Sequence, residues 1–294
     1  MTKQDVISII GISRSKYYQW GKRVGIPNAH NGKIPKSHWL LVSEQESIIC
    51  YCKDKLLLGY RRLTYMMIDE NVVFVSPATV YRILNMNGLL NKWDTKKSSS
   101  KGNGFIQPLK PHEHWHTDIS YVNLLGTFYF LITVLDGYSR MILHHELRAN
   151  MEEYDVEIVL QRTIEKYPES KARLISDNGS QFISKDFKEF VRTSGLTHVK
   201  TSVGYPQSNG KLERYHKTIK TEKIKRSSFL SEEDARAQIA KYVDFYNNER
   251  LHSAIYYLTP REVFDGNMKK RLAERQNKLD NARINRLEKR AFLK

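Results

Sequence analysis

The sequence predicts an α/β protein whose central stretch of strands and helices is preceded and followed by helical regions. Between residues 115 and 201, short apolar runs with strand character alternate with segments of helical periodicity. Before residue 95 and after residue 229, the apolar residues are spaced as in helices. A chain of 294 residues with 40% hydrophobic and 11% aromatic residues is long enough, and apolar enough, to fold into two or more domains.

The first element is a predicted pair of helices joined by a tight turn. Residues 3–10 carry apolar side chains at helical spacing, Gly11 interrupts the pattern, and Ser13 can cap a second helix that extends to Trp20. Such a helix-turn-helix can place its second helix in a DNA groove, although two short helices are also a common packing unit. The basic residues predicted to contact DNA from this second helix are Arg14 and Lys16.

A second helical region follows a stretch rich in Gly, Pro and Asn. Residues 43–58 have helical character, and Ser76 followed by Pro77 is a typical helix start. Basic side chains in this region are predicted to hold DNA phosphates, and the alternative is a solvated basic face. These side chains are Arg61, Arg62 and Arg82.

Residues 96–110, with Lys, Ser, Gly and Pro and few apolar side chains, are predicted to be a linker. Immediately afterwards, residues 112–116 match the His-Glu-x-x-His pattern of zinc proteases. That chemistry requires a helix, so that both histidines lie on one face. Two prolines precede the match and residues 115–122 have strand character, so we expect these histidines to be structural or to lie near Asp118.

The central stretch predicts three consecutive strands, then helices interleaved with two further strands. The predicted strands span residues 115–124, 127–135, 141–147, 174–175 and 196–201, and the predicted helices span 152–167 and 182–193, followed by a helix that carries Glu213. A further helix beginning at Ser231 is predicted to pack against the core. The basic residues of 268–294 predict a helix that contacts DNA or another subunit.

Three acidic residues are candidates for a shared metal site. Asp118 lies within the first central strand, Asp177 ends an apolar run before an Asn-Gly turn, and Glu213 follows Asp177 with 35 residues between them. Two divalent cations roughly 3.5 to 4 Å apart, held by carboxylates, can clamp the attacking and leaving oxygens of a phosphodiester. Asp136 also ends a strand, but an Asp before Gly is typical of a turn. The acids that we expect to be solvent-exposed on a helix are Asp186 and Glu189.

The residues around these acids carry a resemblance to a known family. Thr-Asp-Ile, Ser-Asp-Asn-Gly-x-Gln-Phe and Pro-Gln-Ser-Asn-Gly-Lys-x-Glu-Arg resemble the three blocks of the Asp-Asp-Glu core shared by retroviral integrases and bacterial insertion-sequence transposases. Asn-Asn-Glu-Arg-Leu-His at 247–252, followed by Leu-Thr-Pro at 258–260, resembles the closing motif of OrfB-type transposases of insertion-sequence family 3. Leu251 stands where those transposases often carry Pro. The resemblance covers roughly residues 111–260.

This resemblance implies a ribonuclease-H-like core and a DNA transposase that cuts element ends and transfers the strands into target DNA. It implies that Asp118, Asp177 and Glu213 hold two Mg²⁺ ions, for which Mn²⁺ can substitute. It also implies that basic residues around Glu213 contact DNA, namely Lys211, Lys217 and Lys220. The alternatives are a noncatalytic DNA-binding regulator that retains the core, and a ribonuclease-H-like nuclease that cuts without joining.

Charge and composition agree with a nucleic-acid partner. The net charge of +16 and the pI near 9.6 favour an anionic polymer or surface, and a membrane surface would not explain the three spaced acids. Only Cys50 and Cys52 occur, and no run of about 18 apolar residues is present, so we expect a cytoplasmic protein. The resemblance to bacterial transposases implies that it associates with the bacterial nucleoid. Expected partners are the terminal inverted repeats, target DNA, further copies of the chain and an upstream-encoded subunit.

The predicted domain organisation combines these elements. It consists of a helix-turn-helix at 1–27, a second helical region at 38–95, the linker at 96–110, the catalytic core at 111–228, a helical extension at 229–265 and a basic helical tail at 266–294. Residues 204–210 are predicted to form a mobile loop before the helix that carries Glu213.

Overall fold

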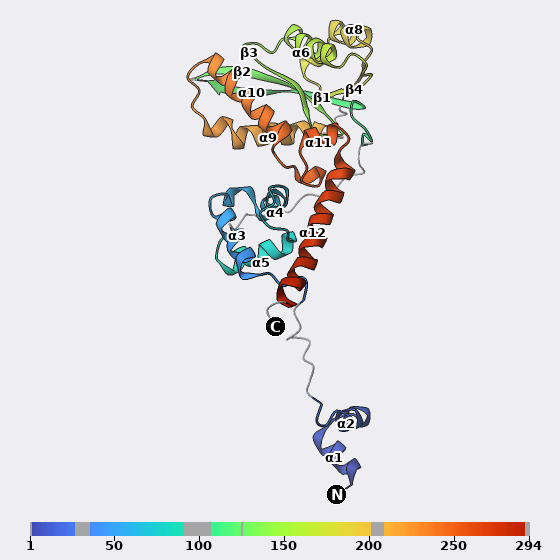
Figure 1. Ribbon diagram of the computed structural model, residues 1–294. Helices are drawn as coiled ribbons and strands as arrows, with labels where there is room; N and C mark the ends of the chain where they lie inside the picture. Colours follow the sequence, from blue (N-terminus) through green and yellow to red (C-terminus); the bar gives the residue numbers. More distant parts are fainter. Residues whose placement is uncertain (1, 27–35, 91–106, 125, 201–208, 292–294) are drawn as a thin grey trace. The chain divides into compact units, whose positions relative to one another are not determined.

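The protein is described by a computed structural model that covers residues 2–26, 36–90, 107–124, 126–200 and 209–291 (Figure 1). The chain divides into two compact units, Met1–Glu44 with Asp280–Lys294, and Gln45–Leu279. Most of the predicted linker and of the predicted loop at 204–210 lies outside the described residues, and the predicted domain boundaries stay predictions. In the described parts of the chain, no helix has the length and apolar character needed to cross a membrane.

The first unit begins with the predicted helix pair, α1 (Lys3–Ile10) and α2 (Arg14–Gly21). Gly11 ends α1 in the left-handed conformation, with φ 67°, and the Ser13 side chain accepts a hydrogen bond from the Lys16 amide to cap α2. Neither helix contains a buried residue, and Ile9 is 72% exposed. The two predicted helices are confirmed, but their apolar side chains do not pack into a buried core.

The second unit contains the second predicted helical region: α3 (Val42–Lys53, which begins in the first unit), the 3₁₀ turn η2 (Leu56–Leu58), α4 (Tyr60–Asp69) and α5 (Pro77–Met86). Ser76 caps α5 by accepting from the Thr79 amide, as the Ser-Pro start predicts. Apolar side chains from these helices and from the connection between α4 and α5 are buried. They comprise Ile48, Cys52, Leu63, Met67, Ile68, Val73, Val75, Val80, Ile83 and Leu84.

A mixed five-stranded sheet forms the centre of the second unit. Its strands are β1 (His114–Leu124), β2 (Thr127–Asp136), β3 (Ile142–Arg148), β4 (Arg173–Ser176) and β5 (Thr197–Lys200), in the order β3-β2-β1-β4-β5. β1, β2 and β3 are antiparallel neighbours, whereas β4 is parallel to β1 and β5 is parallel to β4, with helices in the connections that lead to β4 and β5. This order is that of a ribonuclease-H-like sheet, and it confirms the predicted fold class.

Helices cover both faces of the sheet (Figure 1). On one face lie α6 (Glu153–Lys166), α7 (Ser180–Ile183) and α8 (Lys185–Thr193), which bury Val156, Phe182 and Phe187 against the strands. On the other lie α9 (Gly210–Glu222) and α10 (Glu232–Asn248). The single helix expected over 182–193 is divided in two, because Ser184 caps α8 by accepting from the Phe187 amide.

The sheet face under α9 and α10 has its own apolar core. Its buried strand residues are Val122, Leu124, Leu131, Leu135, Ile142 and Leu147. Its buried helix residues include five from α10, so the predicted packing of the helix that begins at Ser231 is confirmed. These five are Ala235, Ile239, Tyr242, Val243 and Tyr246. The remaining elements of the unit are η4 (Ile224–Arg226), η5 (Ser253–Ile255), α11 (Pro260–Phe264) and the first part of α12 (Met268–Ala291).

The segment that matches the zinc-protease pattern is a turn followed by a strand. His112 has φ 64° and accepts a hydrogen bond at Nδ1 from the Trp115 indole, 3.2 Å away. His116 lies in β1 and is fully buried. The two histidines therefore do not share a helix face, and the predicted strand character of residues 115–122 is confirmed.

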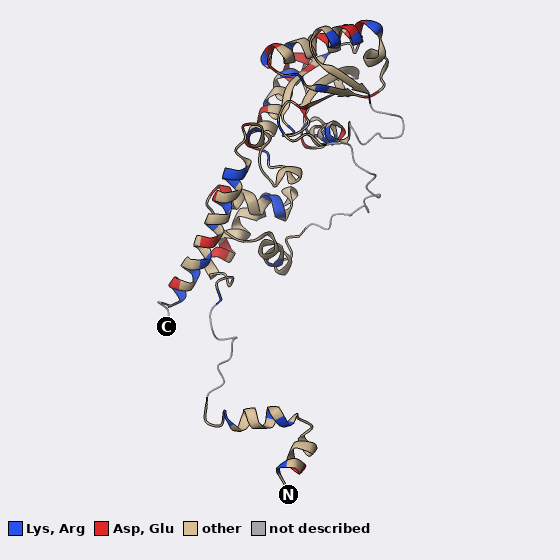
Figure 2. Ribbon diagram, turned by 90° about the vertical axis from the view of Figure 1, so that its right-hand side faces the viewer, with Lys and Arg blue, Asp and Glu red and all other residues tan. Residues whose placement is uncertain are grey.

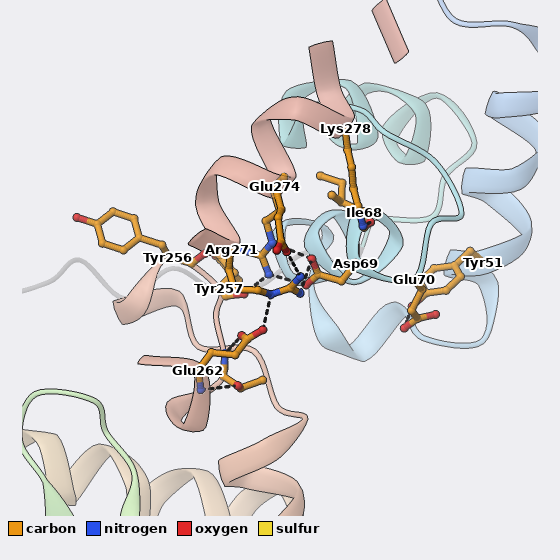
Figure 3. Close-up of polar contacts among 12 residues, drawn as sticks. Tyr51, Ile68, Asp69, Glu70, Tyr256, Tyr257, Glu262, Arg271, Glu274 and Lys278 are labelled. Atoms are coloured by element: carbon orange, nitrogen blue, oxygen red, sulfur yellow. Dashed lines mark hydrogen bonds and ion pairs between the residues drawn. The ribbon is translucent and has the colours of Figure 1, made fainter. Parts of the chain in front are cut away.

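Arginines on α12 hold α4 and the segment before α11 together (Figure 3). The Arg275 side chain is 4% exposed, donates to Asp69 of α4 (Nε to Oδ1, 2.9 Å), and also donates to the Tyr256 and Tyr257 carbonyl oxygens. Arg271 donates to Glu262 at 2.6 Å. Tyr256 and Tyr257 both have φ 57°, so these contacts satisfy carbonyl groups in a strained turn.

Candidate active site

Asp118 lies in β1 on the face that α9 covers. Its Oδ1 accepts a hydrogen bond from the Ile119 amide at 2.9 Å, and its Oδ2 lies 3.5 Å from Nδ1 of His216 on α9. The Asp118 side chain is 19% exposed. It is therefore held between strand and helix while one edge of the carboxylate remains accessible.

Asp177 follows β4 directly, as the sequence predicts. Its Oδ1 accepts from the Gly179 amide at 3.0 Å, which closes the Asn-Gly turn. In the parallel pairing of β1 and β4, His116 is opposite Ile175. Continuing this register by two residues would set Asp177 beside Asp118.

Glu213 occupies the first turn of α9. The helix buries Leu212, Tyr215 and Ile219 against the sheet, which leaves Glu213 exposed. Glu213 and Asp118 line one hollow of about 440 Å³, and Asp177 is not among the described residues that line it. The other lining residues are Ile119, Ser120, Tyr121, His216, Lys217, Lys220, Thr221 and Lys225.

The three acids fit Mg²⁺ by their chemistry, because this ion prefers carboxylate oxygens. Neither Asp118 nor Glu213 makes an ion pair with Lys or Arg among the described residues, so their oxygens are available to a ligand. In the same part of the chain, no group of three or more His, Cys, Asp or Glu side chains is arranged to hold a metal ion. The structure thus brings two of the three acids to one hollow.

The lysines predicted around Glu213 lie in two different places. Lys217 and Lys220 line the hollow, on the same side of α9 as Glu213. Lys211 does not line it; its Nζ donates to the Gly137 carbonyl oxygen at 2.7 Å. Burial, together with the nearby Arg140, lowers the pKa of Lys211 to about 8.

The basic residues predicted on the helical regions are mostly exposed. Arg14 and Lys16 are exposed on α2, and Arg61 and Arg82 are exposed on α4 and α5. Arg62 is the exception, because its side chain is 19% exposed and lies 3.9 Å from Glu222. Burial and the nearby Arg250 lower the pKa of Arg62. The Arg62 side chain therefore packs inside the protein, unlike the exposed Arg61 and Arg82. Along α12, basic and acidic residues are interspersed (Figure 2).

Two polar residues with structural importance were missed by the sequence analysis. Glu222, at the end of α9, accepts two hydrogen bonds from Arg250 (2.7 and 2.6 Å) and one from the Tyr242 hydroxyl (2.9 Å). Asn247 bonds the amide and the carbonyl oxygen of Ile142, both at 2.9 Å. Asn247 and Arg250 belong to the Asn-Asn-Glu-Arg-Leu-His motif, and this motif was the sequence signal that could have indicated their structural roles.

Burial alone would raise the pKa of Glu222, but the hydrogen bonds and charge of Arg250, with the Tyr242 hydroxyl, lower the pKa below its usual value. The carboxylate is therefore ionised at neutral pH. It links the helix that carries Glu213 to α10 and to the motif that follows α10.

Asp136 has the structural role that its Asp-Gly sequence predicts. Its fully buried carboxylate accepts from the His112 amide (2.8 Å) and from the amide (2.7 Å) and hydroxyl (2.6 Å) of Ser139. It anchors the turn between β2 and β3. Asp186 and Glu189 are both exposed on α8, also as predicted.

Two family models match this chain, and both describe an integrase core domain. The first matches residues 108–206 and the second residues 194–260. The catalytic core of the integrase of HTLV-2, solved in a complex with magnesium, is similar at 18% identity and a TM-score of 0.43, over 53% of this chain and 98% of that chain.

Relatives with curated descriptions extend beyond the core. The transposase for insertion sequence element IS904 of Lactococcus lactis is 28% identical over 69% of this chain and 86% of its own length. The transposase for IS629 of Shigella sonnei is 23% identical over 87% of this chain and 89% of its own length. With the two family models and the order of the sheet, these matches place the chain among the insertion-sequence transposases that have an integrase core domain.

Proposed function

We propose that this transposase cuts the ends of its element and joins them to target DNA at one site formed by Asp118, Asp177 and Glu213. The observation that carries the proposal is that Asp118 of β1 and Glu213 of α9, 95 positions apart in the sequence, line the same hollow. The register of β1 and β4 supports the inclusion of Asp177.

The three carboxylates are suited to hold two Mg²⁺ ions, with Mn²⁺ as a substitute. Bound there, the ions would supply an activated water or 3′ hydroxyl and charge stabilisation for the leaving oxygen. The protein's own contribution is to position the acids and to keep Asp118 and Glu213 free of ion pairs with Lys or Arg in the described part of the chain. His216, beside Asp118, limits the rotation of that carboxylate.

DNA is the partner that the surroundings of the site favour. Lys217, Lys220 and Lys225 line the hollow, and none of the three forms an ion pair with an acid in the described part of the chain. Such lysines can neutralise the phosphates on either side of the bond that is cut. Because two element ends must be joined, the active form is a complex of several copies on DNA.

The test compares matched acid-to-amide variants on duplexes that contain an element end, with Mg²⁺ or with EDTA. We expect Glu213→Gln to lose cleavage and joining, because a carboxylate oxygen is removed from the site, while binding of the duplex is retained. Glu189→Gln, an exposed acid on α8, is the control and should join DNA as the wild type does.

Joining by Glu213→Gln at the wild-type rate would contradict the assignment of this residue. Metal-independent binding by the wild type, without any cut product, would favour the regulator instead. Cleavage products without strand-transfer products would favour the nuclease.

A further inference from the structure

Three aromatic residues lie together on the hairpin of β1 and β2. Tyr121 is opposite Phe130 in the strand register, and Phe128 is opposite Asn123, two positions further along β1. All three rings therefore project from one face of the hairpin. The ring centroids of Tyr121 and Phe130 are 5.3 Å apart, and those of Tyr121 and Phe128 are 6.4 Å apart. We refer to these three residues as the aromatic platform.

Two of the three platform residues are exposed and Phe130 is partly buried, although the same sheet face is buried nearer to α6. Ile132 and Val134 of β2 belong to the core under α6, whereas Tyr121 is 52% exposed and Phe128 is 57% exposed. The Tyr121 hydroxyl donates to the sulfur of Met151 at 3.4 Å, a contact that orients the ring. Clustered exposed rings held in place are typical of a binding surface.

The aromatic platform is continuous with the hollow that contains Asp118 and Glu213. The pairing of β1 with β4 ends at His116, and no described strand pairs with Ser120 or Tyr121 on that side of β1. Residues 118–121 of this edge line the hollow. Asp118 projects from the sheet face that α9 covers and the Tyr121 ring from the face that α6 covers, so the acids and the platform meet across the edge of β1.

The opposite wall of the hollow is basic. Lys217, Lys220 and Lys225 come from α9 and the η4 turn that follows it. A basic groove beside exposed aromatic rings is the combination that binds unpaired nucleotides, since cations hold the phosphates and the rings stack on the bases. A base inside a duplex is already stacked on both faces, so only an unpaired base can use such a ring.

We propose that Tyr121, supported by Phe128 and Phe130, stacks on an unpaired DNA base next to the bond that is cut. This inference rests on the proposed function, because it takes the hollow as the place of the scissile phosphate. The platform then favours DNA in which the nucleotides next to the scissile phosphate are unpaired. It keeps the flanking base from returning to the duplex while the phosphate lies near Asp118 and Glu213.

The experiment uses the full chain and two duplexes of one sequence, one fully paired and one with three unpaired nucleotides beyond the element end. 2-Aminopurine at the first unpaired position reports stacking by loss of its fluorescence. We expect wild type and Tyr121→Phe to quench this fluorescence and Tyr121→Ser not to. Tyr121→Ser should also bind the unpaired probe about 5- to 150-fold more weakly, the range for one aromatic–base stack, with little change for the paired probe.

Tyr154→Ser is the matched control, because Tyr154 is 69% exposed on α6 and does not line the hollow. It should quench and bind as the wild type does. Phe128→Ser provides a second variant in case Tyr121→Ser does not fold, and it should reduce the preference for the unpaired probe.

Equal weakening of both probes by Tyr121→Ser, or unchanged quenching, would overturn the proposal. So would a change in oligomeric state with unchanged quenching, because the platform would then be a contact between copies of the chain. Quenching by wild type in the absence of any joining would leave the platform intact and reject the proposed catalytic function. Joining that depends on Glu213, without quenching, would support the proposed catalytic function and reject the stacking role of the platform.

Discussion

At the scale of single residues, His252 is a neutral ring placed among cations. Burial lowers its pKa well below the usual value, and Arg250, Arg62 and Arg140 lower it further. Arg250 Nη1 lies 3.0 Å from Nε2 of His252, so the neutral ring can accept this hydrogen bond. The ring of Tyr246 packs edge-on at 4.5 Å. A proton on His252 would remove the hydrogen bond and add a positive charge to this cluster.

This residue gives a pH-dependent prediction. Below a pH of about 6.5, the unfolded chain binds a proton at His252 that the folded chain does not bind, so the free energy of unfolding falls as the pH falls. We expect His252→Gln to reduce that fall between pH 6.5 and 5 by up to about 1.4 kcal/mol per pH unit. Urea unfolding at several pH values measures how the free energy of unfolding of each protein changes with pH. The exposed His38, changed to Gln, is the control, and equal slopes in wild type and His252→Gln would refute the prediction.

At the scale of elements, α9 has a different task at each end. Its first turn presents Glu213 to the hollow, and its last turn fixes the helix through Glu222. Arg250 is 8% exposed and Glu222 is 31% exposed, so the pair is only partly screened by water. The position of the helix that carries Glu213 therefore depends on Arg250, which follows α10.

Removing Arg250 should be costly because Glu222 would remain as a partly buried charge without its main partner. We expect Arg250→Met to lower the free energy of unfolding by about 3 kcal/mol. Arg236→Met, which breaks an exposed pair with Glu232 on α10, should cost less than about 1 kcal/mol. Denaturant unfolding measures both variants. Similar small losses in the two would show that Glu222 does not need Arg250.

At the scale of the whole molecule, the net charge of +16 predicts that DNA binding weakens as salt increases. Each lysine that contacts a phosphate contributes about 0.9 to the slope of log K against log salt concentration. We expect Lys217→Gln and Lys220→Gln each to reduce the slope by about this amount. Lys211→Gln should change it little, because Lys211 donates to the Gly137 carbonyl instead. Affinities measured between about 50 and 200 mM salt test these slopes. An effect of Lys211→Gln as large as that of Lys217→Gln would argue against the contact of Lys211 with Gly137.

Much of the molecule could be predicted from short stretches of sequence. The helix starts at Ser13, Ser76 and Ser231 are all capped by those side chains, since a cap involves only residues three positions apart. The strands and helices of the core were found within a few residues of their bounds by their apolar periodicity. Motif blocks identified the three acids, and the order of the sheet followed from the family resemblance and is confirmed.

By itself, the sequence determined the class of fold, the elements and the acids that are candidates for catalysis, because each depends on residues close together in the chain. Only the tertiary structure decided which side chains meet. It turned Arg62 inward to Glu222 and Lys211 to Gly137, and it joined Tyr121 to the hollow of Glu213. A side chain's partners depend on how distant segments pack, and that packing is the result of many weak contacts that no local pattern records.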